Sequence, residues 1–333
     1  MKLFLTYDYE LFFGEPTGTV EKCIIEPTNL LREIANRTGV KMVFFIDTGY
    51  LKQLERFKDE FPQVKYEHDL VKSQINDLIR DGHDCQLHIH PHWEDCSHNG
   101  NAWIMKTDRY KLDDFSDDMI EKIMTEYAEI LGKWTGKPIH SYRAGGWCLQ
   151  PFNRIQKAFK KIGIRLDSTV FPGGKFTAGN YYYDFTNAPH LSKWRFNDDL
   201  CQASSNGMFW EYPISNYKYS ALFFWRLFAL GRLQPKLHKS IGDGYPMASP
   251  GLRKKMLTKG MNLSAAADGY FVTKLNAVLR NNKKRGYEEM VILGHPKACT
   301  HFALKKLEQF IEKNKNKHQF LTFSDLNHTN EIN

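Results

Sequence analysis

Three histidines stand close together in one short stretch and give the strongest chemical signal in the chain. His88, His90 and His92 alternate with single residues at the end of a run of strand-forming residues. Neutral imidazole is a common ligand of zinc, iron, cobalt and nickel, and two histidines with one carboxylate form a frequent catalytic metal set. A lone histidine is more often a packing residue, but this cluster favours metal binding over packing.

The spacing leaves open which of the histidines would bind a metal. His88 and His90 share one face of a strand, whereas His88 and His92 would share one face of a helical turn. Pro91 biases His90 away from helical backbone and favours a strand that turns after it.

Two acidic residues follow the first predicted strand, residues 3–7. Because side chains alternate along extended backbone, Asp8 and Glu10 point to the same side. Two carboxylates on one face repel each other unless a cation or a shared proton separates them. The pair therefore fits a cation site, and the alternative is an exposed acidic loop.

Two more polar residues stand at predicted strand ends. Arg143 ends a strand and precedes two glycines that permit a tight turn, and an arginine there can orient a carboxylate and keep its pKa low. His295 follows a late strand and can donate a proton to a leaving group. The alternatives are a surface ion pair for Arg143 and a hydrogen-bonded loop position for His295.

Strand-like and helical segments alternate along most of the chain, which predicts a parallel sheet. Seven or eight such units favour a barrel, with an open doubly wound sheet as the alternative. The carboxyl ends of parallel strands meet at one edge, so the polar residues described above indicate one hydrolytic metal site. The predicted strands are 3–7, 42–46, 84–89, 141–143, 165–169, 290–293 and 320–323, and the predicted helices are 27–38, 69–81, 116–136, 152–162, 264–285 and 302–314.

Taken in order, these motifs resemble those of the polysaccharide deacetylase family, which has a NodB-homology domain and is also called carbohydrate esterase family four. Residues 6–10 are similar to its Thr-Phe-Asp-Asp motif, and His88 and His92 match His-x-x-x-His. Residues 143–146 approximate Arg-x-Pro-x-Gly, and residues 292–295 resemble the late histidine motif. The match spans roughly residues 3–296. Glu10 lies one position later than the second aspartate and Gly145 replaces the proline, which indicates a divergent branch.

The resemblance implies a distorted (β/α)7 TIM-like barrel and metal-dependent removal of an N-acyl group, acetyl in the first place. The implied substrate is an amino sugar or glycan intermediate in surface-polysaccharide biosynthesis. The roles implied by the resemblance are Asp8 as general base, Arg143 as the residue that orients it, His295 as general acid, and Glu10, His88 and His92 as ligands of a divalent metal, usually zinc.

Other activities stay open on the same fold. The acyl group could be formyl, the amide could belong to a compound other than a sugar, or a catalytically idle barrel could bind a glycan or a partner protein.

The net charge is concentrated in one part of the chain. The 333 residues carry 46 Lys and Arg against 38 Asp and Glu, a net charge of +8. Residues 217–262, here named the basic segment, hold nine of the basic residues and one acid, so the remaining 37 bases and 37 acids balance. We predict that this segment is an insertion in a single domain spanning residues 1–333.

The basic segment also holds many aromatic residues, which leaves three interpretations. It could lie on a membrane surface, cover the site and hold a phosphate-bearing or lipid-linked substrate, or form a solvated helix pair whose aromatic side chains complete the core. Nucleic-acid binding is not expected, because no recognition motif accompanies the charge.

The N-terminus and the cysteines predict a cytoplasmic protein, attached at most peripherally to the inner membrane face. Asp8 interrupts any secretion signal, and no apolar stretch approaches the ~20 residues of a membrane span. The six cysteines are scattered without a Cys-x-x-Cys pair, which fits a reducing compartment.

Overall fold

The computed structural model describes residues 1–247 and 252–328, which form two compact units. Unit 1 comprises Met1–Met42 and Ile214–Leu321, and unit 2 comprises Val43–Pro213 together with the chain from Thr322 onward. Each unit is described by itself. The prediction that the chain forms one domain with an insertion stays a prediction.

Unit 1 is built on three parallel strands with β1 (Lys2–Tyr9) in the middle. On one side β1 pairs with β14 (Glu289–Gly294), and on the other with β15 (Gln319–Phe320). Nearly every residue of β1 and all of β14 are buried, as expected for parallel strands that are covered on both faces. The sequence therefore shows two uninterrupted apolar runs here instead of an alternating pattern.

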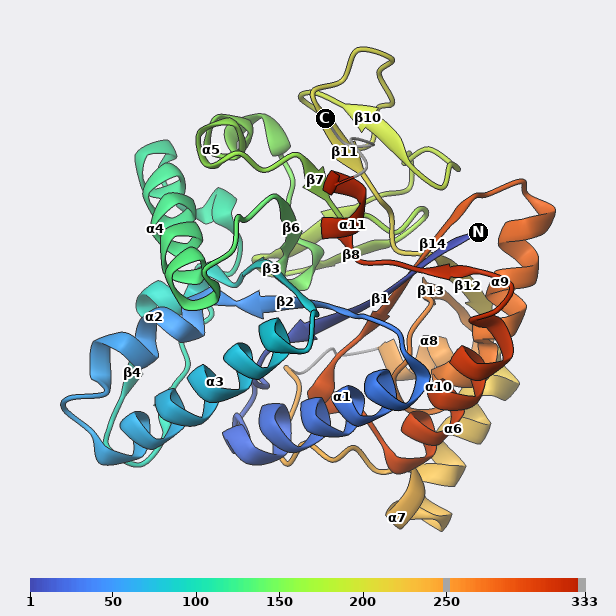
Figure 1. The fold of residues 1–333 in the computed structure, drawn as a ribbon, viewed down its shortest axis with the longest axis horizontal. Coiled ribbons are helices and arrows are strands. Elements are labelled where there is room, and N and C mark those ends of the chain that lie inside the picture. Colours follow the sequence, from blue (N-terminus) through green and yellow to red (C-terminus); the bar gives the residue numbers. More distant parts are fainter. Residues whose placement is uncertain (248–251, 329–333) are drawn as a thin grey trace. The chain divides into compact units, whose positions relative to one another are not determined.

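The helical elements of unit 1 are η1 (Glu21–Ile25), α1 (Glu26–Thr38), η6 (Gly269–Lys274), α9 (Leu275–Lys284), η7 (Pro296–Ala298) and α10 (His301–Asn314). Helices α1 and α10 lie side by side (Figure 1). Helix α1 ends where the sequence predicts, because Gly39 adopts the left-handed conformation at its C-cap.

The basic segment begins and ends on a pair of antiparallel strands in unit 1. Strand β12 (Asn216–Tyr219) pairs with β13 (Met261–Ser264), so the chain leaves and returns at the same place. Between them lie α6 (Ala221–Leu233), α7 (Pro235–His238) and α8 (Leu252–Lys259). Three buried aromatic residues, Tyr219, Phe223 and Phe224, form a small core of their own.

Unit 2 contains a run of six neighbouring strands, of which five are parallel. Its order is β2 (Val43–Asp47), β3 (Asp84–Ile89), β6 (Ser141–Ala144), β7 (Leu166–Asp167), β11 (Phe209–Glu211) and the antiparallel β10 (Trp194–Phe196). Two small hairpins, β4 (Ser97–His98) with β5 (Trp103–Ile104) and β8 (Lys175–Ala178) with β9 (Tyr181–Asp184), lie outside this sheet.

The helices of unit 2 are α2 (Thr48–Phe57), α3 (Pro62–Arg80), α4 (Asp117–Thr135), α5 (Gln156–Ile162) and α11 (Phe323–His328), with short 3-10 turns η2 (Pro91–Asp95), η3 (Leu112–Asp114), η4 (Gly145–Trp147) and η5 (Phe152–Arg154). Helices α2, α3 and α4 pack against one another (Figure 1). The predicted start of α4 is confirmed, because the Ser116 hydroxyl accepts the Met119 N–H at 3.4 Å.

One predicted helix, residues 264–285, is wrong over its first half. The Ala265 N–H donates to the Ser215 carbonyl at 2.6 Å and the Ala267 N–H donates to the Leu293 carbonyl at 2.7 Å, so this alanine run is extended. Pairing with neighbouring backbone overrides the helix preference of alanine. The regular helix α9 begins only at Leu275.

No helix among residues 1–247 and 252–328 has the length and apolar character needed to cross a membrane.

Candidate metal and catalytic site

His88 lies on β3 of unit 2 and has a fixed orientation. Its Nδ1 lies 2.8 Å from the carbonyl oxygen of Arg143 on the neighbouring strand β6. A carbonyl only accepts hydrogen bonds, so Nδ1 carries the proton and Nε2 keeps a lone pair. Metal-binding histidines commonly have this arrangement, in which one ring nitrogen donates to the protein and the other binds the ion.

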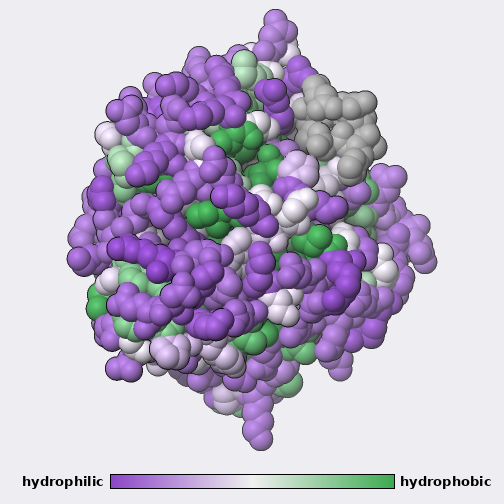
Figure 2. All heavy atoms as spheres, turned by 60° about the vertical axis from the view of Figure 1, so that its left-hand side comes forward, coloured by the Kyte–Doolittle hydropathy of each residue, from purple (hydrophilic) through white to green (hydrophobic). Residues whose placement is uncertain are grey.

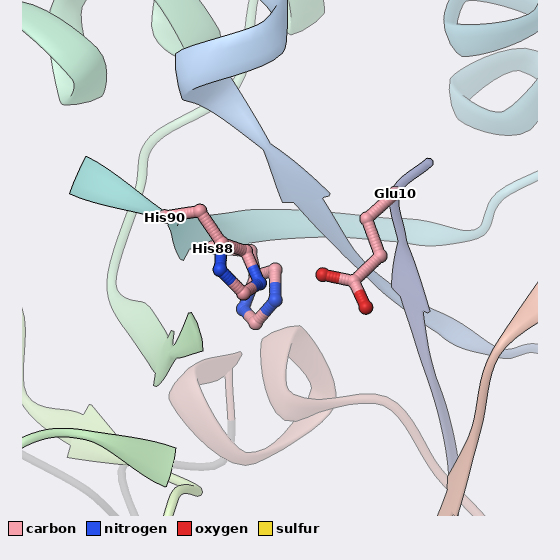
Figure 3. A group of neighbouring side chains, drawn as sticks. All are labelled: Glu10, His88 and His90. Atoms are coloured by element: carbon pink, nitrogen blue, oxygen red, sulfur yellow. The ribbon is translucent and has the colours of Figure 1, made fainter. Parts of the chain in front are cut away.

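His90 follows β3 directly, and its ring lies beside that of His88 with 4.9 Å between the ring centroids (Figure 3). Gly145 approaches the His90 ring so closely that a Cβ there would lie 2.5 Å from Nδ1. Only glycine leaves space for this ring. The residue that replaces the proline of the family motif therefore makes room for a histidine that the sequence left as an open candidate.

His92 lies in η2 and is fully buried between two aromatic side chains. Its ring is stacked on Tyr110, at 5.5 Å between centroids and 6° between planes, and on Trp93, at 5.9 Å and 20°. Such stacking stabilises the packing of the histidine as an aromatic side chain. The prediction that His92 is a metal ligand stays a prediction, and His90 is the alternative ligand.

Arg143 ends β6 and is completely buried, so the alternative of a surface ion pair is wrong. Its Nε donates to the Ser168 carbonyl at 2.7 Å and its Nη2 donates to the Ser168 hydroxyl at 3.1 Å. The guanidinium also lies over the Phe45 ring at 4.3 Å. These contacts fix the orientation of the guanidinium, as a positioning role requires. The predicted contact with Asp8 stays a prediction.

A buried aspartate at the end of β2, Asp47, escaped the sequence analysis. It is the register partner of His88 on the adjacent strand, and it accepts the Trp93 indole N–H at 2.6 Å. The signal was present, because an acid that follows a buried strand is the same pattern that identified Asp8. This hydrogen bond satisfies the indole N–H of Trp93, whose side chain is fully buried and packs in the interior of unit 2.

Two more buried acids of unit 2 are register partners on neighbouring strands, Asp167 on β7 and Glu211 on β11. Thr169 donates to Asp167 through its N–H at 3.1 Å and its hydroxyl at 2.7 Å. Burial, and then the charge of Asp167, raise the pKa of Glu211 well above its ordinary value. Burial raises the pKa of Asp167 as well, so this buried pair of carboxyl groups retains a proton to higher pH than ordinary acids do.

Unit 1 brings together three residues that the sequence identified. Asp8 and Glu10 follow one another along β1 and its end, and both are buried, so the alternative of an exposed acidic loop is wrong. The Nε2 of His295 lies 3.7 Å from Oδ2 of Asp8 and 3.9 Å from Oε1 of Glu10. These distances are too long for hydrogen bonds but short enough for strong charge interactions.

His295 is held by an aspartate that the sequence analysis missed. The backbone N–H of His295 donates to Oδ1 of Asp268 and its Nδ1 donates to Oδ2, both at 2.8 Å. Burial lowers the pKa of His295, but the charge and hydrogen bond of Asp268, together with Asp8 and Glu10, outweigh it and raise the pKa above the ordinary value. Asp268 was hidden within the helix wrongly predicted over residues 264–285.

Lys297 is the second residue that the sequence analysis missed in unit 1. This buried side chain lies 2.9 Å from Oε1 of Glu10 and donates to the Leu11 carbonyl at 2.6 Å. Its ammonium group is also 4.9 Å from the rings of both Phe12 and Phe13. Lys297 therefore offsets part of the cost of burying Glu10 and fixes its position. Its only sequence signal was its place two residues after His295.

Each unit thus carries side chains suited to acid–base chemistry or to metal binding. Unit 1 holds two buried carboxylates beside a histidine that retains its proton. Unit 2 holds an imidazole whose Nδ1 donates to a backbone carbonyl, with a second imidazole beside it. We use the name carboxylate–histidine cluster for five residues of unit 1, which are Asp8, Glu10, Asp268, His295 and Lys297.

Comparison with solved structures identifies the fold. A protein described as a "putative polysaccharide deacetylase" from Mycobacterium smegmatis aligns with 99% of this chain and 89% of its own length, at a TM-score of 0.53 and 15% identity. The structure of Puue allantoinase aligns with 98% of this chain and 88% of its own length, at a TM-score of 0.52 and 12% identity. No family model matches the sequence, and no curated protein matches it.

The predicted resemblance to the polysaccharide deacetylases is confirmed at the level of the fold. The predicted α/β fold class, a distorted (β/α)7 barrel, is confirmed by the same likeness.

Proposed function

We propose that this chain is a metal-dependent hydrolase that removes an N-acyl group from an amino sugar or glycan intermediate. Acetyl is the first candidate for the acyl group. The observation that carries the proposal is the histidine held by Asp268 in unit 1. His295 keeps its proton above the ordinary imidazole pKa and directs Nε2 toward the buried carboxylates of Asp8 and Glu10. A protonated imidazole beside a buried carboxylate is an acid–base pair of the kind that amide hydrolysis requires.

The donor groups of both units fit a divalent cation. Glu10 of unit 1 offers a carboxylate, and His88 and His90 of unit 2 offer two imidazoles (Figure 3), which are donor types that suit a divalent cation. Because Nδ1 of His88 donates to a carbonyl, Nε2 is the nitrogen that we propose as the ligand atom. We propose Glu10, His88 and one of His90 and His92 as ligands, and the space that Gly145 leaves favours His90. Such a nitrogen and oxygen set suits zinc.

The proposed roles of the remaining residues follow from their chemistry. Asp8 takes a proton from the attacking water, and the buried guanidinium of Arg143 orients Asp8. His295 gives its proton to the nitrogen of the departing amine, while Asp268 holds the ring in place. A zinc ion held by the proposed ligands would act as a Lewis acid toward the acyl carbonyl and would lower the pKa of water.

Two alternatives remain from other classes. Hydrolysis of an amide in a compound other than a sugar is supported by the likeness to an allantoinase, and a formyl group could replace acetyl. A catalytically idle barrel that binds a glycan or a partner is the other alternative. It predicts a purified protein with no bound metal and no hydrolysis.

The expected substrate is an N-acylated sugar or glycan that carries a phosphate or a lipid, which the basic segment would attract. No nucleic-acid partner is expected. A cytoplasmic location at the inner membrane face is part of the proposal.

The test uses the purified full-length chain. Metal content is measured by elemental analysis before and after dialysis against a chelator, and zinc is then restored. Acetate, formate and ammonia are assayed with N-acetylated and N-formylated amino sugars and with allantoin. We expect acetate release that disappears with the metal and returns with zinc, and hydrolysis that continued after complete metal removal would overturn metal dependence.

Asp8→Asn separates metal binding from turnover. The variant removes the proposed base but none of the proposed ligands, so it should retain zinc and lose about 10²–10⁴-fold in turnover. Full activity of this variant would overturn the proposed role of Asp8.

A further inference from the structure

Exposed apolar side chains are concentrated in the basic segment. Eleven large apolar side chains are exposed among the described residues, and six of them lie between residues 222 and 247. They are Leu222, Trp225, Leu233, Leu237, Tyr245 and Met247. Single exposed apolar residues are normal on a soluble protein, but a local concentration marks an interaction surface.

The solvent-facing side of α6 carries three of these six side chains. The exposed positions of the helix are 222, 225, 226, 229, 232 and 233, which recur at helical spacing and define one stripe. Leu222 is 62% exposed, Trp225 58% and Leu233 78%. A surface helix normally presents charged and polar residues to water. Here the only charged members of the stripe are Arg226 and Arg232.

The exposed residues are not an unfolded remnant, because the opposite side of α6 is firmly packed. Phe223 and Phe224 are buried in the core of the segment. Leu227 and Phe228 pack against that core, and the guanidinium of Arg253 lies 5.0 Å from the Phe228 ring. Trp225 of the stripe is also held in place, because its indole N–H donates to the Leu257 carbonyl of α8 at 3.1 Å. Folding within unit 1 therefore leaves the stripe in water.

The charge around the stripe has one sign. All nine basic side chains of the basic segment are exposed, and its only acid is Asp243. They are Lys218, Arg226, Arg232, Lys236, Lys239, Arg253, Lys254, Lys255 and Lys259. A second copy of this chain would bring equal positive charges together. A nucleic acid would match the charge but offers no apolar phase for leucines.

We infer that the basic segment docks on the surface of an anionic lipid bilayer, with the stripe of α6 in the interface. Leucine and tryptophan side chains enter the boundary between head groups and acyl chains, while arginine and lysine extend to the lipid phosphates. Helix α6 has only 13 residues and lies along the membrane plane instead of crossing it.

The other side of α6 connects this surface to the carboxylate–histidine cluster. A cavity of about 470 Å³ is lined by Leu227 and Phe228 of α6, by Tyr270 and Phe271 of η6, and by Asp268, which also binds His295. Docking would therefore bring the lipid surface close to the proposed acid. The docking itself does not depend on the proposed reaction.

The first experiment is co-sedimentation of the full-length chain with vesicles. Vesicles of phosphatidylcholine alone are compared with vesicles of phosphatidylcholine mixed with phosphatidylglycerol, at low and high salt. We expect binding to the anionic vesicles that weakens with salt, because screening shortens the reach of charges. Equal binding to both vesicles, or binding to neither, would overturn the inference.

A charge-reversal variant localises the contact. Arg253→Glu, Lys254→Glu and Lys255→Glu together should lower the partition coefficient at least about a hundredfold, since each basic residue contributes about fivefold at an anionic surface. The matched control changes the exposed Lys283 and Lys284 of α9 and the adjoining Arg285 to Glu, which alters the net charge equally. An equal loss in both variants would show a general charge effect and overturn the assignment to this segment.

The apolar contribution needs its own variant. Leu222→Gln with Leu233→Gln should lower binding about tenfold and leave its salt dependence unchanged. The control pair is Ile104→Gln with Leu191→Gln, two exposed residues of unit 2. If the Leu222 and Leu233 variant bound vesicles as tightly as wild type, the attraction would be purely electrostatic and an acidic partner would replace the bilayer.

Tryptophan fluorescence reports the depth of contact. All seven tryptophans lie in the described part of the chain, and among them only Trp225 is largely exposed to solvent. Lipids brominated near the head group should quench fluorescence in wild type and much less in Trp225→Phe. Equal quenching in both proteins would place the contact elsewhere. Turnover of a small uncharged substrate, which has no phosphate for the basic segment to attract, should be unchanged in the Arg253, Lys254 and Lys255 variant. This measurement separates the inference from the proposed function.

Discussion

Charged side chains are usually exposed and large apolar side chains usually buried, and two regions of unit 1 differ from this pattern in opposite ways. The carboxylate–histidine cluster buries charged side chains, including Glu10 and Lys297. The basic segment exposes large apolar side chains, including Leu222 and Leu233. By contrast, the face shown in Figure 2, on the side where α2, α3 and α4 lie in Figure 1, is largely hydrophilic with only scattered apolar residues.

The two departures have different costs and therefore different uses. Burying a charge costs several kcal/mol unless a partner compensates it. The cluster supplies these partners, since Asp268 holds His295 and Lys297 holds Glu10. Exposing a leucine costs little in folding but leaves surface that only an apolar partner can cover. The first region is organised for chemistry and the second for attachment.

The largest expected effect concerns the histidine with the fixed tautomer. His88→Ala should lose bound metal and about 10³-fold or more in turnover, because a proposed ligand disappears. Elemental analysis and the acetate assay measure both losses. The control is His301→Ala, an exposed histidine at the start of α10, which should change neither. Normal metal content in His88→Ala would show that the buried polar residues are not a metal site.

A smaller effect should follow from changing Asp268. Its charge raises the pKa of His295, so His295 stays protonated, and able to donate, to a higher pH than an ordinary histidine. Asp268→Asn removes that charge and lowers the pKa. The alkaline limb of the pH–rate profile should then move to lower pH, with about a hundredfold loss of rate at high pH.

The control for this variant is Asp243→Asn, the exposed acid of the basic segment, which should leave the limb in place. If the limb did not move in Asp268→Asn, His295 would not be the proton donor.

The sequence predicted the residues whose positions follow from local strand patterns. Asp8, Glu10, His88 and His295 were found because each follows a short apolar strand, and the ends of parallel strands form one edge. The same pattern predicted the α/β fold class. Within unit 1 the structure brings three of these four together.

The residues that the sequence missed depend on contacts between distant segments. Asp268 follows three alanines whose extended backbone is stabilised by hydrogen bonds to Ser215 and Leu293, and no local pattern shows that pairing. Glu211 and Asp167 lie on strands of two or three residues, which are too short to show periodicity. The choice between His90 and His92 likewise depends on Gly145, more than fifty residues away in the chain.

Gly145 provides a test that distinguishes the two histidines. A methyl group at this position would meet the His90 ring, so Gly145→Ala should displace it and lower metal affinity about 10–100-fold if His90 is a ligand. The control is Gly132→Ala in α4, where a Cβ meets nothing within 4 Å. Metal loss in His92→Ala but not in Gly145→Ala would identify His92 as the ligand instead.

The smallest expected effect is on the pH dependence of stability, and it tests whether the buried carboxyl groups of Glu211 and Asp167 retain a proton in the folded protein. Burial and the charge of Asp167 raise the pKa of Glu211 in the folded state, so it releases its proton at higher pH than in the unfolded chain, where the ordinary pKa is 4.5. The folded state then binds more protons than the unfolded state, so this residue makes the free energy of unfolding fall as pH rises above that value.

Glu211→Gln keeps a hydrogen-bond donor to Asp167 but has no proton to lose. Its stability at neutral pH should stay within about 1 kcal/mol of wild type and depend less on pH, whereas Glu211→Ala should cost about 3 kcal/mol. Urea unfolding at several pH values measures all three proteins, and an equally steep decline in Glu211→Gln would mean that Glu211 is ionised in the folded protein.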